Sequence, residues 1–347
     1  MTRREWVATV GATCGLLGVG VGAGGLGIGV ATLSGCNSPE APSSGGQLVC
    51  TAPFVGDLVT HLARGLDVKV ASLMGPGVDP HLYRPTASDV AQLLSSRSIF
   101  VVGLGLEGKM GETLSRAADS GRRVVVLGDA IPHDDLFAAG EEGSHAAWDP
   151  HVWMDPALWS MCTGRGATGV IDALGLANTK VAATIQMQAR LYQDRLAALR
   201  NWGIERTGTI PAERRVIITS HDAFHYFGRA FGFEVFGIQG VSTESEAGLD
   251  DVRRLIDLIV ERKIPAVFAE SSVADKSVQA LIEGAAARGH SVKLGGTLFA
   301  DSLGEPGTHE GTYLGMIDHD ITTIVTALGG SIHPLGHEGL LSRPATA

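Results

Sequence analysis

The sequence predicts an α/β protein of two lobes, each with a mostly parallel four-stranded sheet flanked by helices, joined by one long helix. Two observations favour this fold class. Short runs rich in Val, Ile and Leu alternate with helical stretches, which is typical of parallel sheets covered by helices. These runs fall into two sets of four, and the stretch 178–202 between the sets contains neither Gly nor Pro.

Eight short segments, each bounded by Gly, Asp or Pro, are the predicted strands. The first set lies at 47–51, 68–73, 98–102 and 123–127, and the second at 215–219, 233–236, 266–269 and 291–294. Helical stretches such as 54–66 and 88–96 separate the strands of the first set. This order of elements predicts two similar lobes.

The long helix between the two sets fixes the expected domain organisation. Its apolar positions include Val181, Ile185, Leu191, Leu196 and Leu199. We therefore expect an N-terminal lobe at 47–177, a linking helix at 178–206, a C-terminal lobe at 207–330 and an irregular tail at 331–347.

The N-terminal segment 1–36 predicts an export signal. No charged residue occurs between Glu5 and Glu40, and the segment ends in Leu-Ser-Gly-Cys at Cys36. This ending resembles a bacterial lipobox, in which Cys36 is lipidated and becomes the first mature residue; residues 37–46 then form a flexible tether. A membrane-spanning anchor is the alternative. The two arginines near the start also resemble a twin-arginine signal, so the export route stays open.

Composition excludes other classes of protein. The chain has 347 residues, is 44% hydrophobic and only 18% charged, so it is not a disordered polyelectrolyte. Its net charge of −10 makes it a poor partner for nucleic acid. Of the four cysteines, Cys14 and Cys36 lie in the N-terminal segment. Cys50 and Cys162 form no CxxC motif, and we expect them to be buried thiols rather than a disulfide or a metal pair.

Four polar residues follow predicted strands and indicate a metal site. The tripeptide Asp-Pro-His occurs twice, ending at His81 and at His151; proline fixes the backbone before each histidine, and the adjacent Asp can orient a neighbouring loop or imidazole. His221 stands at the exit of an apolar strand and Asp301 just beyond another. Ligands bind where the carboxyl ends of parallel strands open into a crevice. Three imidazoles and one carboxylate suit a first-row divalent metal.

Several strings identify a family resemblance. They are GPGVDPHLYRPTASDV, GLGLEGKM, DPHVWMDP, TSHDAF, FAESSV and GGTLFADSLGEPGTHEGTY, in that order over about 48–328. They resemble the zinc/manganese solute-binding proteins of bacterial ABC importers. The resemblance implies two α/β lobes bridged by one rigid helix, with metal held in the cleft by His81, His151, His221 and Asp301.

The resemblance also implies a function. The protein would be a receptor and not an enzyme, capturing Zn²⁺ or Mn²⁺ as transported ligand and delivering it to an ABC permease with its ATPase subunit. We expect a monomer, anchored by lipid to the outer face of the cytoplasmic membrane, in the periplasm. Imidazoles bind metal only when deprotonated, so affinity should fall as the pH drops through about 6.

Three histidines bear on the choice of metal. Family members that prefer manganese commonly have Glu where this chain has His221, so the nitrogen ligand favours zinc. Many zinc-specific members carry a long His-rich loop, whereas 132–148 offers only His133 and His145 among acidic residues. We expect that loop to be a solvated acidic one.

His225 replaces a small residue of the family and is expected to be a bystander at the side of the cleft.

Two other functions remain as alternatives. The turn from Gly103 to Gly108 reads Gly-Leu-Gly-Leu-Glu-Gly and matches a dinucleotide-binding fingerprint, with Asp129 as the later acidic residue. An exported NAD-dependent oxidoreductase would use it, although the turn follows about the third strand rather than the first. A metallohydrolase would use His221 and His225, whose spacing is close to H-E-x-x-H but has Asp in place of Glu.

Overall fold

The computed structural model describes residues 46–139, 147–244 and 247–342. The predicted export signal, Cys14, Cys36 and all but the last residue of the predicted tether lie outside the described residues, as does His145. No helix within the described part of the chain combines the length and apolar character needed to cross a membrane.

The first lobe contains one four-stranded parallel sheet with strand order β2-β1-β3-β4. Its strands are β1 (Leu48–Cys50), β2 (Val70–Ser72), β3 (Ser98–Val101) and β4 (Arg123–Val126). Its helices are α1 (Pro53–Leu62), α2 (Ala87–Ser95), α3 (Gly111–Asp119) and α4 (Pro156–Ala173). The predicted strands of this lobe are confirmed within one or two residues at each end.

Local sequence signals set where these helices begin. Proline stands at the first turn of α1, where its missing N–H is not needed. The α2 helix starts with a capping box, in which Thr86 accepts from the Asp89 backbone and Asp89 accepts from the Thr86 backbone. Helix α1 buries Phe54, whose ring stacks on that of Trp153 with 4.3 Å between centroids. The core of this lobe therefore extends to the segment that carries His151.

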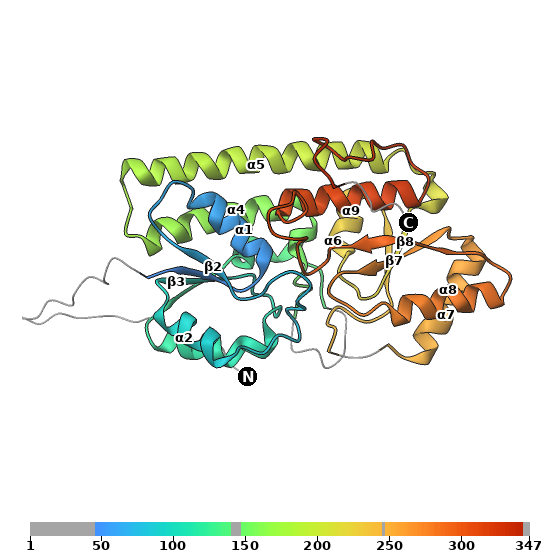
Figure 1. Cartoon of the computed structure of the whole chain (residues 1–347), viewed down its shortest axis with the longest axis horizontal. Helices are drawn as coiled ribbons and strands as arrows, with labels where there is room; N and C mark the ends of the chain where they lie inside the picture. The colour runs from blue at the N-terminus through green and yellow to red at the C-terminus, as the bar shows by residue number, and fades with distance from the viewer. Residues whose placement is uncertain (1–45, 140–146, 245–246, 343–347) are drawn as a thin grey trace, which may run out of the picture. The chain divides into compact units, whose positions relative to one another are not determined.

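The long helix α5 (Lys180–Thr207) packs against helices from both halves of the sequence, including α1 and α4 along its N-terminal half and α6 and α9 toward its C-terminal end (Figure 1). The side chain of Thr179 caps its start by accepting from the Ala182 N–H. Gly203 permits close packing near its end, since a Cβ there would lie 2.6 Å from the Phe231 ring. The predicted long helix is thus present.

The second lobe is also α/β, but its sheet differs from the expected one. Its strands are β5 (Val216–Thr219), β6 (Glu234–Gly237), β7 (Ala266–Glu270) and β8 (Lys293–Leu298). Its helices are α6 (His225–Phe231), α7 (Leu249–Arg262), α8 (Lys276–Ala287) and α9 (Tyr313–Ala327). The strands form two parallel pairs, β5–β6 and β7–β8, with β5 next to β7.

We expected one continuous four-stranded sheet here. The sequence pattern indicates which segments are strands, but it does not determine whether neighbouring strands are joined by hydrogen bonds, and β5 and β7 lie side by side in separate ladders. A register shift at Val267 and Phe268 also interrupts the β7–β8 ladder.

Short 3₁₀ helices connect several elements. They are η1 (Gly108–Met110), η2 (Gly128–Ala130), η3 (His133–Asp135), η4 (Val152–Met154) and η5 (Ala212–Arg214). The segment after α9 is irregular, and two of its backbone N–H groups donate hydrogen bonds to buried carboxylates. Asp318 accepts from the His337 N–H, and Glu310 accepts from the Ser342 N–H.

The two described cysteines are buried and unpaired. Cys50 lies in β1 and Cys162 in α4, and both are fully buried. Burial raises the pKa of both thiols, that of Cys162 to about 12. The expectation that they are buried is confirmed.

Candidate metal centre

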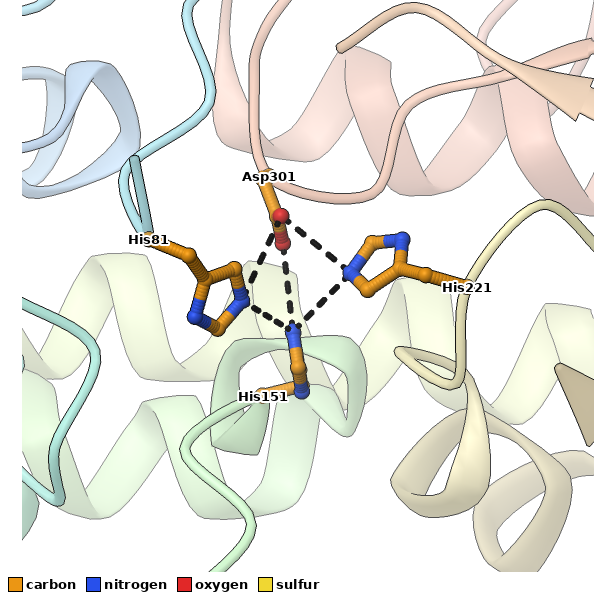
Figure 2. A group of neighbouring side chains, drawn as sticks. All are labelled: His81, His151, His221 and Asp301. Atoms are coloured by element: carbon orange, nitrogen blue, oxygen red, sulfur yellow. Dashed lines mark hydrogen bonds and ion pairs between the residues drawn. The ribbon is translucent and has the colours of Figure 1, made fainter. Parts of the chain in front are cut away.

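Four side chains from distant parts of the sequence converge at one buried point (Figure 2). His81 lies in the loop between β2 and α2, and His151 immediately precedes η4. His221 follows β5 by two residues, and Asp301 follows β8 by three. All four are buried. Among the described residues, this is the one group of His, Cys, Asp or Glu side chains whose potential ligand atoms gather so closely.

The ligand atoms are separated by distances that suit one small cation. The Nε2 atom of His151 lies 3.2 Å from that of His81 and 3.3 Å from that of His221. Asp301 places Oδ1 3.3 Å from His151 Nε2, and Oδ2 3.2 Å from His221 Nε2 and 3.6 Å from His81 Nε2. A tetrahedral zinc site with bonds of about 2.0–2.2 Å has ligand atoms about 3.3–3.6 Å apart. The ligand atoms of the four side chains all lie within 4.8 Å of one another, so together they can hold one small cation.

Two of the imidazoles are oriented by carboxylates on their outer nitrogens. The Nδ1 of His151 lies 2.7 Å from Asp149 Oδ1, and the Nδ1 of His221 lies 2.5 Å from Glu270 Oε2. Such contacts fix a ring so that its other nitrogen faces the metal. The sequence suggested the role of Asp149 through its Asp-Pro-His motif. It did not suggest Glu270, although the FAESSV string contains it.

The fourth ligand is held through its backbone neighbours. The Phe299 N–H donates to Asp320 Oδ1 at 2.9 Å, and the Trp153 indole donates to the Ala300 carbonyl at 2.7 Å. These two bonds fix the segment just before Asp301. Neither carboxylate oxygen of Asp301 has a hydrogen-bond donor other than an imidazole among the described residues. Both oxygens are thus directed toward the imidazoles.

His81 is held differently from the other two histidines. Its backbone N–H donates to Asp79 Oδ1 at 2.8 Å, whereas the described residues provide no carboxylate behind its ring. Burial lowers the pKa of His81 to about 3. This imidazole is therefore neutral, as a metal ligand must be.

The other two histidines are charged in the metal-free protein. Burial disfavours the charged form of His151, but Asp149 and Asp301 outweigh it and raise the pKa to about 9. Burial likewise opposes the charge on His221, while Glu270 and Asp301 hold its pKa well above the ordinary value. For Asp301, His221 and His151 outweigh burial and hold the pKa well below its usual range. A metal ion must therefore displace protons from two rings.

His225 is not the bystander that we expected. Its ring is 39% exposed and lies between two carboxylates, with Nδ1 3.7 Å from Asp149 Oδ2 and Nε2 3.3 Å from Asp222 Oδ1. It thus contacts the carboxylate that orients His151. The sequence could not reveal this contact, because the start of α6 is brought against Asp149 only by packing. His133 lies in η3 with its ring near that of Trp148.

The backbone N–H groups at the start of the glycine-rich turn donate to Glu107, a residue of the same turn. The Glu107 carboxylate accepts from the Val102 and Gly103 N–H groups at 2.8 and 3.0 Å, and from the Thr51 hydroxyl at 2.8 Å. A dinucleotide site needs such N–H groups for its phosphates. This arrangement opposes the oxidoreductase alternative.

The hydrolase alternative fails on local structure. His225 is the first residue of α6, whereas His221 precedes the helix. The two rings therefore do not lie one turn apart on one helical face, as an H-E-x-x-H site requires.

Comparisons with known proteins agree with this description. The profile of the family described as "Zinc-uptake complex component A periplasmic", ZnuA, matches residues 48–327. The chain is 42% identical over 300 residues to the manganese-binding lipoprotein MntA of Bacillus subtilis, which covers 85% of this chain and 95% of that protein. It is 44% identical over 292 residues to the zinc-binding protein TroA of Treponema pallidum, covering 84% and 92% respectively.

The fold is similar to solved structures as well. The structure of the periplasmic zinc-binding protein TroA from Treponema pallidum superposes with a TM-score of 0.76 at 44% identity, covering 82% of this chain and 99% of that one. A second TroA structure gives a TM-score of 0.75 at 30% identity. The two-lobed α/β fold class predicted from the sequence is confirmed.

Proposed function

The chain belongs to the ZnuA family of periplasmic zinc-uptake components, and from this premise we propose that it is the metal-binding receptor of an ABC importer. It captures Zn²⁺ or Mn²⁺ outside the cytoplasmic membrane and delivers the ion to a permease with its ATPase subunit. Members of this family are solute-binding receptors rather than enzymes.

The observation that carries the proposal is the buried cluster of His81, His151, His221 and Asp301. Four protein ligands leave no open position for an activated water, which catalytic zinc usually retains. Two ligands come from each half of the chain. We propose that the bound metal holds two lobes together. These are the lobes 47–177 and 207–330, which the helix 178–206 joins.

The donor set favours zinc over manganese. Three imidazole nitrogens and one carboxylate are softer than the oxygen-rich sets that manganese prefers, and zinc binds more tightly than manganese at most sites. Among the relatives, MntA is named for manganese and TroA for zinc.

We further propose that the protein acts as a monomer tethered to the membrane. Cys36 ends a lipobox-like sequence, and MntA is named a lipoprotein. Acyl chains on Cys36 would hold the mature protein at the outer face of the cytoplasmic membrane, and residues 37–46 would provide reach.

Native mass spectrometry of the soluble form starting at Gly46, with zinc and manganese in competition, tests the function. We expect one metal ion per chain, mostly zinc, and loss of that ion in His221→Ala. His333→Ala is the matched control, since His333 is an exposed residue of the tail. Absence of metal from the wild-type protein, or retention of a nicotinamide cofactor, would overturn the proposal.

A further inference from the structure

The loop that carries His81 makes two direct contacts with the opposite lobe. The Thr243 hydroxyl donates to Asp79 Oδ2 at 2.6 Å, and the Gly77 N–H donates to Ser302 Oγ at 2.7 Å. Thr243 lies between β6 and α7, and Ser302 directly follows Asp301. Each contact therefore bridges the two lobes within a few residues of a metal ligand.

The residues that form these two hydrogen bonds lie in surroundings that favour stable bonds. Thr243 and Ser302 are buried, so their hydroxyl groups are shielded from competing water. Gly77 has φ of +71°, a backbone conformation that glycine adopts without strain. Next to Thr243, Glu244 forms an ion pair of 2.8 Å with Lys109 of the first lobe. The segment around Thr243 is thus tied to the first lobe at two successive residues.

The metal ligands differ in how firmly they are held. His151 and His221 are each oriented by a carboxylate of their own lobe, Asp149 and Glu270 respectively. Among the described residues, no carboxylate orients the outer nitrogen of His81, and its backbone N–H donates to Asp79 Oδ1. The other oxygen of the same carboxylate accepts from Thr243 of the opposite lobe. The position of His81 therefore depends on a residue that also joins the lobes.

We propose that the loop from Gly75 to His81 is the moving part of the metal site, and that the Asp79–Thr243 and Gly77–Ser302 hydrogen bonds latch it closed. This inference rests on the proposed function. Asp79 and Thr243 are positioning residues, which hold His81 against the bound ion without touching it. When the two lobes separate, both bonds break, His81 withdraws and the ion can leave. The latch therefore sets how fast the metal is released.

Substitution of Thr243 by valine tests the latch, because valine keeps the shape and removes the hydroxyl. Zn²⁺ release from the soluble protein starting at Gly46 is measured by stopped flow against excess chelating dye. We expect release about tenfold faster than in the wild type, the effect of losing one hydrogen bond to a carboxylate. The association rate should change by less than about twofold, since changes at one interface act mainly on dissociation.

Two variants of the same segment are matched controls. Thr243→Ser retains the hydroxyl and should release zinc at the wild-type rate. Ser242→Ala should also behave as the wild type, because within the described part of the chain the Ser242 hydroxyl contacts the Glu244 N–H of its own turn and no group of the first lobe. Ser302→Ala removes the acceptor of the Gly77 bond and provides a second, independent test, with faster release again expected.

The outcomes separate this inference from the proposed function. If the wild-type protein binds one zinc ion, and Thr243→Val and Ser302→Ala release it at the wild-type rate, the latch is refuted while the receptor function stands. Release from Thr243→Ser as fast as from Thr243→Val would also refute it, because the hydroxyl would then be irrelevant. If the wild-type protein binds no metal, the proposed function itself fails.

Discussion

The Nδ1 atom of His221 lies 2.5 Å from Oε2 of Glu270, and both side chains are fully buried. Glu270 is the last residue of β7, and its other oxygen accepts from the His221 backbone N–H at 2.7 Å. One carboxylate therefore fixes both the main chain and the ring of a candidate metal ligand. The Asp149 carboxylate does the same for His151, with 3.0 Å to its backbone N–H and 2.7 Å to Nδ1.

Loss of the charge on Glu270 should weaken metal binding. We expect Glu270→Gln to reduce zinc affinity by about 10- to 100-fold, the usual effect of removing a carboxylate behind a ligand histidine. Competition titration against a zinc chelator measures the change. Glu261→Gln is the control, because Glu261 is exposed on α7. Equal affinities for the two variants would show that Glu270 does not orient His221.

Direct removal of a ligand should have a similar or larger effect. We expect His81→Ala and Asp301→Ala each to weaken zinc binding by about tenfold or more, because each removes one of four ligand atoms. The same competition titration applies. Wild-type affinity in both variants would exclude these residues from the metal site.

Zinc binding should release protons at neutral pH. In the metal-free protein the pKa of His151 is raised to about 9 and that of His221 lies well above its ordinary value, so both rings are protonated. We expect release of about two protons per zinc ion at pH 7. Calorimetric titration in buffers of different ionisation enthalpy measures this number.

The raised pKa of His151 changes the pH dependence of zinc affinity from the one that histidines of ordinary pKa would give. An imidazole pKa of about 6.5 would place the loss of affinity near pH 6. With the pKa of His151 at about 9, the affinity should already decline as the pH falls below about 9. An affinity that is constant between pH 9 and pH 7 would contradict this prediction.

The metal-free protein should be most stable near neutral pH. The pKa of His151 is higher in the folded protein than in the unfolded chain, so its stabilisation is complete below about pH 6.5 and is lost as the pH rises through about 9. The pKa of His81 is lowered to about 3, so stability also falls as the pH drops below about 6.5. We expect a maximum Tm near pH 6.5 by scanning calorimetry.

Asp149→Asn tests the alkaline side of this profile. The variant removes one of the charges that raise the pKa of His151, so its Tm should decline less between pH 6.5 and pH 9 than that of the wild type. Asp119→Asn on the exposed face of α3 is the control and should leave the profile unchanged. Identical profiles for the wild type and Asp149→Asn would show that Asp149 does not raise the pKa of His151.

The two buried cysteines should be unreactive in the native state. Burial raises the pKa of Cys50 and Cys162, so neither thiol ionises readily near neutral pH. In the form starting at Gly46, we expect a thiol reagent at pH 8 to label neither residue until denaturant is added, after which both react. Rapid labelling of the folded protein would show that one of them is accessible.

The sequence by itself determined most of the secondary structure and the candidate ligands. The strands β1 to β7 and the helix α5 follow local signals, namely apolar runs bounded by Gly, Asp or Pro and a long stretch without Gly or Pro. The last strand, β8 (Lys293–Leu298), overlaps the predicted 291–294 at only two residues. His81 and His151 stood out because Asp-Pro-His is repeated, and His221 and Asp301 because each follows a strand. These features are local, and so a single sequence reveals them.

Only the tertiary structure decided which distant groups act on those ligands. Glu270 behind His221, His225 beside Asp149 and Thr243 on Asp79 are contacts between segments that no periodic pattern relates. That β5–β6 and β7–β8 form separate ladders was likewise decided by packing. The physical reason is the same in each case: hydrogen bonds and charge interactions act over a few ångströms in space, and chain packing alone determines which residues come that close.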